Sequence, residues 1–170
     1  MLCFMFFLAW FVSFLRGRGG AASWLGTAAG IAGGVTMAVK LASVMPMTAG
    51  MLDHDELTAT QARLLTDMNG AAFVVTFLTF GTFLLAGGLA ILAGGALGRV
   101  AGWSAAVIGG TCIALTALSG VDPVATNPLP FLLGLLWVLV TGIRLAVRPP
   151  RPAVVPSGEV AAPSALAPMV

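Results

Sequence analysis

Five long apolar runs, almost free of charge, constrain what this chain can fold into more than any other feature. They cover residues 2–15, 24–44, 71–93, 100–118 and 129–147. A transmembrane helix needs about 20 predominantly apolar residues, and all but the first run come close to that length. Only 8% of the residues are charged, against about a quarter in soluble domains. The sequence therefore predicts an all-α membrane protein, an antiparallel bundle of about five transmembrane helices within residues 1–148.

The two ends of the chain differ from this pattern. The first run would span about 21 Å as a helix, against a hydrocarbon core of about 30 Å. A signal peptide carries positive charge before its apolar run, whereas Arg16 and Arg18 follow this one, so we expect a retained helix and a natural start upstream of Met1. Residues 149–170 are rich in Pro and Ala without a period that would bury one face, and they predict a disordered tail.

The basic residues predict the orientation, because short cytoplasmic loops carry an excess of Lys and Arg. If the first helix runs from outside to inside, Arg63 falls outside, and six of the eight basic residues fall at or near the cytoplasm. These six are Arg16, Arg18, Arg99, Arg144, Arg148 and Arg151. The tail is then cytoplasmic, and the outer face carries most of the acidic residues.

The outer stretch 46–70 is long enough for a short extracytoplasmic helix. Thr58, followed by Gln61 three residues on, forms the pattern of a capping box, which marks a helix start. Leu57, Leu64 and Leu65 then recur at helical spacing. We expect a separate short helix here, with an outward extension of the third span as the alternative.

The same stretch holds the only histidine, within four consecutive polar residues: Asp53, His54, Asp55 and Glu56. Carboxylate oxygens and an imidazole can bind a divalent cation. Four adjacent residues cannot all point at one ion, however, and no second His or Cys completes a recognisable site. We interpret the cluster as a solvated loop that caps a helix, with a metal site as the weaker alternative. No cofactor is expected.

Lys40 lies inside the second apolar run, where an ionisable group is costly and often functional. It precedes Pro46 by six residues, so about 9 Å of helix separates it from the outer loop. A four-carbon side chain can extend its ammonium group over such a distance. Lys40 is therefore either a residue that reaches the membrane surface or part of a polar pathway or ligand site.

Gly26, Gly30 and Gly34 repeat the GxxxG spacing along the second run. Small residues let transmembrane helices approach closely, because lipid provides no hydrophobic force between helices. The spacing predicts a packing groove for another helix of this chain or of a second copy.

Several function classes have little support. The apolar runs contain no Asp, Glu or His for intramembrane catalysis, and one histidine cannot supply both axial ligands of a haem. A net charge of +2 without a basic block does not indicate nucleic-acid binding.

Two segments resemble a known family: LAWFVSFLRGRGGAASWLGTAAGIAGGV at 8–35 and MNGAAFVVTFLTFGTFLLAGGLAILAGGALGRVAGW at 68–103. They are similar to small, uncharacterised polytopic membrane proteins of high-GC bacteria, a domain of unknown function, over about residues 5–145. In that family the turn at 95–103 often carries Pro and Trp, where this chain has Gly98 and Val100. The resemblance implies a location in the bacterial inner membrane and no known activity, so it assigns no functional residues.

Together these features give a first hypothesis of a non-enzymatic interaction or support subunit in the lipid bilayer, with a membrane-protein partner. The alternative is a small-molecule or ion permease that acts as a homo-oligomer and uses Lys40. A membrane enzyme with a metal at the outer acidic loop is the weaker alternative.

Overall fold

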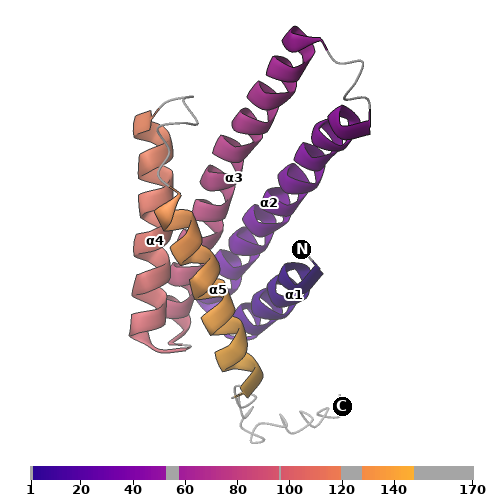
Figure 1. The fold of residues 1–170 in the computed structure, drawn as a ribbon. Helices are drawn as coiled ribbons and strands as arrows, with labels where there is room; N and C mark the ends of the chain where they lie inside the picture. Colours follow the sequence, from indigo (N-terminus) through magenta and orange to yellow (C-terminus); the bar gives the residue numbers. More distant parts are fainter. Residues whose placement is uncertain (1, 53–57, 96, 120–127, 148–170) are drawn as a thin grey trace, which may run out of the picture.

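The computed structural model describes residues 2–52, 58–95, 97–119 and 128–147, and in these residues the fold is all-helical (Figure 1). The helices are α1 (Leu2–Arg16), α2 (Gly20–Leu52), α3 (Ala59–Gly94), α4 (Arg99–Ser119) and α5 (Leu129–Val147). Four of them, α2 to α5, are long and apolar enough to cross a membrane, whereas α1 has 15 residues. The prediction of an all-α chain with several potential membrane-spanning helices is confirmed.

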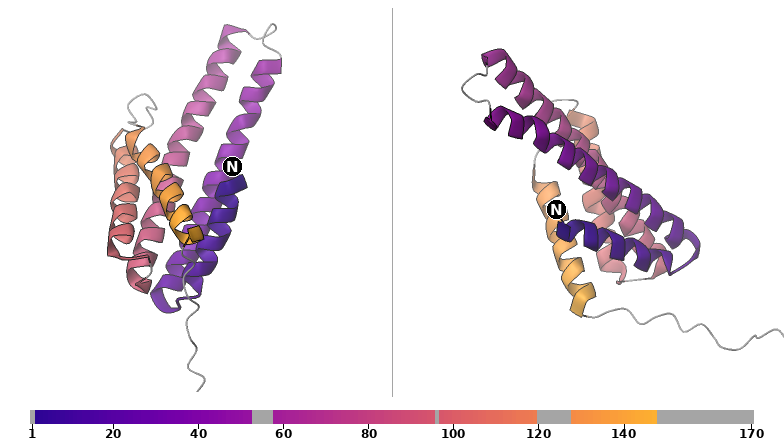
Figure 2. Two further views of the ribbon diagram at one scale, coloured as in Figure 1. Left: turned by 60° about the horizontal axis from the view of Figure 1, so that its bottom comes forward. Right: turned by 90° about the vertical axis from the view of Figure 1, so that its right-hand side faces the viewer.

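The helices form an antiparallel bundle around α3. It contacts α2 on one side, α4 on the other, and also α5 and α1. Helix α1 packs on α2, and α5 crosses α4 and α3 at an angle (Figures 1 and 2). In the most apolar stretch of α3, 56% of the residues are buried. In the corresponding stretches of α2, α4 and α5, the share is 28% or less. The core therefore lies along α3, and the other helices leave most of their apolar surface exposed.

Glycines bring the backbones of α3 and α4 into direct contact. Gly81 and Gly88 on α3, and Gly102 and Gly109 on α4, are each seven residues apart, and all four are buried. A Cβ atom added to Gly109 would lie 2.5 Å from the carbonyl oxygen of Gly81. A Cβ atom added to Gly88 would lie 2.6 Å from the carbonyl oxygen of Gly102. No side chain fits between these helices, so glycine is required at both points.

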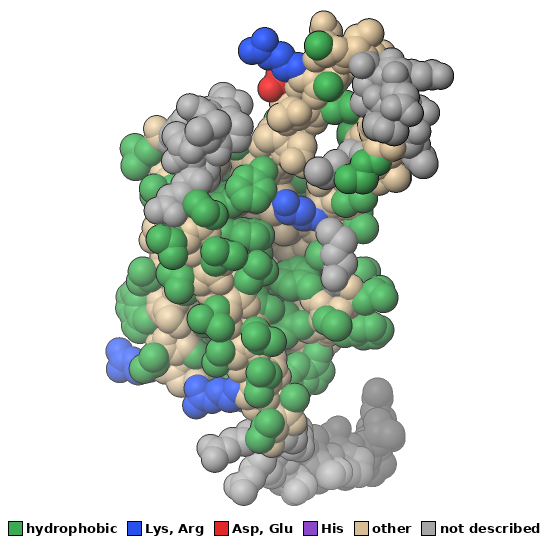
Figure 3. All heavy atoms as spheres, viewed as in Figure 1, with side chains coloured by type: hydrophobic (Ala, Val, Ile, Leu, Met, Phe, Trp, Pro, Cys, Tyr) green, Lys and Arg blue, Asp and Glu red, His purple; other side chains and the backbone are tan. Residues whose placement is uncertain are grey.

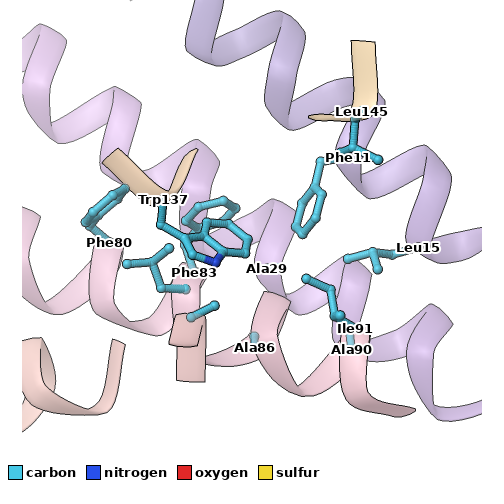
Figure 4. Close-up of a cluster of buried hydrophobic side chains, with 12 residues drawn as sticks. Phe11, Leu15, Ala29, Phe80, Phe83, Ala86, Ala90, Ile91, Trp137 and Leu145 are labelled. Atoms are coloured by element: carbon cyan, nitrogen blue, oxygen red, sulfur yellow. The ribbon is translucent and has the colours of Figure 1, made fainter. Parts of the chain in front are cut away.

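Aromatic side chains fill the angle between α1, α3 and α5 (Figure 4). The rings of Phe11 and Trp137 meet edge to face with their centroids 6.2 Å apart, and Phe11 meets Phe83 in the same way at 6.1 Å. The Trp137 indole Nε1 also donates a hydrogen bond of 3.1 Å to the carbonyl oxygen of Ala101 on α4. Trp137 therefore ties α5 to both α1 and α4 while its polar group is satisfied.

The prediction of a separate short helix between the second and third spans is wrong for the residues described there. Helix α2 continues through Pro46 to Leu52, and α3 begins at Ala59. The capping box does form, with a bond of 2.9 Å from the Thr58 amide to the Gln61 side chain, but it starts α3 itself. No proline separates this start from the apolar run, and the helix continues through Asn69 and Gly70 into the third span. The predicted tail lies outside the described residues.

The close α3–α4 contact predicts opposite effects of alanine at two adjacent glycines. Gly109→Ala forces its Cβ into the α3 backbone, and such overpacking costs about 1–3 kcal/mol of unfolding free energy. Gly110 has no atom within 4 Å of an added Cβ, so Gly110→Ala is the matched control and keeps or slightly raises stability. Thermal unfolding of the detergent-solubilised variants measures both effects. Equal melting temperatures for the two variants would contradict the backbone contact.

Candidate functional site

Lys40 reaches across from α2 to aromatic side chains of α3 and α5. Its half-buried side chain places Nζ 4.9 Å from the centroid of the Phe73 ring. Phe73 in turn lies 6.1 Å from the ring of Phe131 on α5. The face of an aromatic ring attracts a cation within about 6 Å, so this contact stabilises the ammonium group in an apolar setting.

These contacts show how far along the bundle axis, its level, Lys40 lies. Phe131 lies in the first turn of α5, which begins at Leu129. Lys40 is therefore level with the N-terminal end of α5, and α2 continues beyond it to Leu52. The ammonium group therefore lies near the end of the bundle at which α5 begins, although both α2 and α3 continue beyond it.

A hollow of about 230 Å³ surrounds the Lys40 side chain, and we refer to it as the Lys40 hollow. Four helices line it, with side chains that include Phe4, Thr36, Lys40, Thr76, Phe131 and Leu135. Figure 3 shows the molecule as viewed in Figure 1: apolar side chains dominate this face, basic side chains lie toward its two ends, and one more lies between them.

The hydroxyl groups of the Lys40 hollow are occupied by the protein itself. Thr76, fully buried, donates a hydrogen bond of 2.7 Å to the carbonyl oxygen of Ala72. The Thr36 hydroxyl donates to the carbonyl oxygen of Ala32 at 2.8 Å and lies 2.9 Å from the hydroxyl of Thr79 on α3. Among these groups, the two threonine hydroxyls have already used their donor hydrogens, so Lys40 is the one that can still donate a hydrogen bond to a ligand.

The acidic cluster of Asp53, His54, Asp55 and Glu56 lies outside the described residues, so its metal-binding alternative is not tested by this structure. Within the described ranges, no group of three or more His, Cys, Asp or Glu side chains is placed to hold a metal ion.

The GxxxG glycines divide between two environments. A Cβ atom on Gly26 would lie 2.7 Å from Cβ of Leu15, and one on Gly30 would lie 3.0 Å from a methyl group of Val12. Both glycines therefore pack against α1. Gly34 has no atom within 4 Å of an added Cβ, whereas the neighbouring Gly33 lies against Leu8. The sequence spacing identified two of the α1-facing glycines, Gly26 and Gly30, but the third contact is made by Gly33 in place of Gly34.

The described arginines gather mostly at one end of the bundle. Arg16, Arg18, Arg99 and Arg144 lie in or beside the α1–α2 turn, the start of α4 and the last turn of α5. A Cβ atom on Gly94 would lie 3.4 Å from Cβ of Arg18, so the α1–α2 turn and the end of α3 are neighbours. Arg63 and Asp67 lie on the first turns of α3, at the opposite end.

A second hollow, which the sequence did not indicate, lies between α1 and α5 and measures about 510 Å³. We call it the α1–α5 groove. Its lining is apolar and includes Phe4, Phe7, Leu135, Val138 and Gly142. Because these residues are more than 120 positions apart along the chain, no local pattern marks them as neighbours.

Comparison with known proteins does not assign a family or a site. No protein-family model matches the chain, and neither a curated protein nor a solved structure is found to match it. The resemblance to a bacterial family of unknown function stays a prediction.

The Thr36–Thr79 contact joins α2 to α3 beside Lys40, and its removal predicts a modest loss of stability. Thr36→Val keeps the side-chain shape but loses the interhelical bond, at a cost of about 0.6 kcal/mol for such bonds in membranes. Thr82→Val is the matched control, since the exposed Thr82 bonds only to the Leu78 carbonyl of its own helix. Unfolding in detergent mixtures measures the difference, and an equal loss for both variants would contradict an α2–α3 role.

Proposed function

We propose that this chain is a multi-pass protein of the bacterial inner membrane whose role is non-enzymatic: it interacts with or supports a membrane-protein partner. The observation that carries the proposal is the length of the α2–α3 hairpin. Helices α4 and α5 have 21 and 19 residues, about 32 and 29 Å, which matches a hydrocarbon core of about 30 Å. Helices α2 and α3 have 33 and 36 residues, about 50 and 54 Å.

The excess length lies at one end. Beyond the level of Lys40 and Phe73, α2 continues over 41–52 and α3 runs over 59–72, and we call these two segments the outer arm. The left view of Figure 2 shows both helices passing the adjacent ends of α4 and α5. A tilt of about 20° would shorten a 50 Å helix by only about 3 Å along the membrane normal, so tilting does not account for the arm.

The outer arm exposes apolar side chains where the bilayer defined by α4 and α5 would no longer cover them. Met45 and Met51 on α2 are 75% and 71% exposed, and Leu64 on α3 is 59% exposed. Large exposed apolar patches in water mark interaction sites. Flexible methionine side chains are common at such surfaces. The arm therefore favours a protein partner at the outer face of the membrane.

The charge distribution supports an orientation with the outer arm outside and the C-terminus in the cytoplasm. Four arginines lie at the end opposite the arm, as stated above, and the excess of Lys and Arg belongs on the cytoplasmic side. The arm itself carries both signs of charge, with Arg63 and Asp67 one helical turn apart. A non-enzymatic role is consistent with the lining of the Lys40 hollow, whose hydroxyl groups are all held by helix carbonyls.

The orientation predicts opposite labelling of two introduced cysteines. In a background with Cys3→Ser and Cys112→Ala, we expect Thr60→Cys on the outer arm to react with an impermeant thiol reagent in intact cells. Ser157→Cys in the tail should react only after the membrane is permeabilised. Labelling of the tail position in intact cells would invert the topology.

The partner role predicts that crosslinking depends on position. A photoreactive amino acid at Met45 or Leu64 should form one discrete adduct with a membrane protein in living cells. The same amino acid at Val107, which is 61% exposed in the middle of α4, is the matched control and should contact lipid. Met45→Asp should abolish the adduct at Leu64 while the protein keeps its unfolding temperature.

Two outcomes would count against this function. Identical products at Met45, Leu64 and Val107 would show that the outer arm has no specific partner. A solute flux in proteoliposomes that disappears in a folded Lys40→Ala variant would favour the permease alternative instead.

A further inference from the structure

The Lys40 hollow and the α1–α5 groove are adjacent, since Phe4 and Leu135 line both of them. The Lys40 hollow lies at the first turn of α5, and the groove follows α5 down to Ala146. Together they make one crevice along the bundle, with a basic group at one end and apolar walls over the rest.

The length of this crevice suits a lipid chain. From Phe131 to Ala146, α5 rises about 22 Å. One leaflet contributes about half of a hydrocarbon core that is about 30 Å thick. An acyl chain that entered beside Lys40 could therefore extend along α5 through its whole leaflet while in contact with Phe7, Val138 and Gly142.

The charge at the open end of the crevice favours an anionic ligand. Lys40 Nζ has the Phe73 ring as its neighbour and no carboxylate within 4.0 Å among the described residues. The threonine hydroxyls beside it are already bonded to helix carbonyls. A cation at the edge of the hydrocarbon core is stabilised by an opposite charge, which the phosphate of an anionic lipid supplies.

We propose that the crevice binds one anionic phospholipid, with its phosphate at Lys40 and one acyl chain in the α1–α5 groove. The lipid would fill the surface groove between α1 and α5, above the side chains through which the two helices meet. This inference rests on the same membrane orientation as the proposed function but needs no protein partner, so the purified chain alone can test it.

Native mass spectrometry of the full chain in detergent provides the test, with phosphatidylglycerol and phosphatidylcholine of identical acyl chains as probes. We expect one phosphatidylglycerol to bind in preference to phosphatidylcholine. Lys40→Gln should reduce that preference about fivefold or more, from the ~1 kcal/mol that one basic residue contributes near anionic lipid. Arg63→Gln, which removes an exposed cation on the outer arm, is the matched control and should leave it unchanged.

Leu135→Trp tests the groove separately from the charge. The residue is 43% exposed and lines both hollows, so a larger side chain there blocks the passage without entering the core. We expect it to weaken binding of both lipids, and Lys40→Arg to retain the preference for phosphatidylglycerol. If Lys40→Gln does not fold, the Leu135→Trp and Lys40→Arg results decide the question. The proposal would be overturned if Lys40→Gln and Arg63→Gln showed the same preference for phosphatidylglycerol over phosphatidylcholine. Unaltered binding of both lipids to Leu135→Trp would also overturn it.

Discussion

The rest of the structure depends on the direct contact between the α3 and α4 backbones. In lipid the helices gain nothing from burying apolar surface against one another, so association relies on van der Waals contact and a few hydrogen bonds. Gly81 and Gly109 provide this contact at one level, and Gly88 and Gly102 provide it two helical turns away. A pair of helices that touch along their backbones is a rigid support, and α2, α5 and α1 are then added through side chains.

The remaining helices pack less tightly, which explains where the open crevice lies. Helix α1 docks on α2 through Gly26, Gly30 and Gly33, whereas Gly34 has no atom within 4 Å of an added Cβ. Helix α5 is held by Trp137, which bonds to Ala101 and contacts Phe11. Between these attachments no small-residue pair brings α1 and α5 together, so the groove and the Lys40 hollow remain between them.

The sequence predicts those helix ends that nearby residues determine. The predicted helix 129–147 has the bounds of α5, and the predicted helix 100–118 agrees with α4 to within one residue at each end. Both agree because charged residues, Gly and Pro flank continuous apolar runs. The bounds of α2 and α3 were missed, since polar and apolar residues alternate over 46–70 and polarity alone does not end a helix. The surroundings of Lys40 could not be predicted either: Phe73 and Phe131 come from helices 33 and 91 positions away.

The position of Lys40 links the crevice to the outer arm. A buried cation in mid-membrane would need a partner within the bundle, whereas in the orientation proposed above the start of α5 lies where hydrocarbon gives way to headgroups. Below that level α2 borders α1, α3 and the crevice; above it α2 runs beside α3 and exposes Val44 and Met45. Lys40 therefore marks the boundary between two environments on one continuous helix. A ligand bound there would contact α2 at the base of the outer arm.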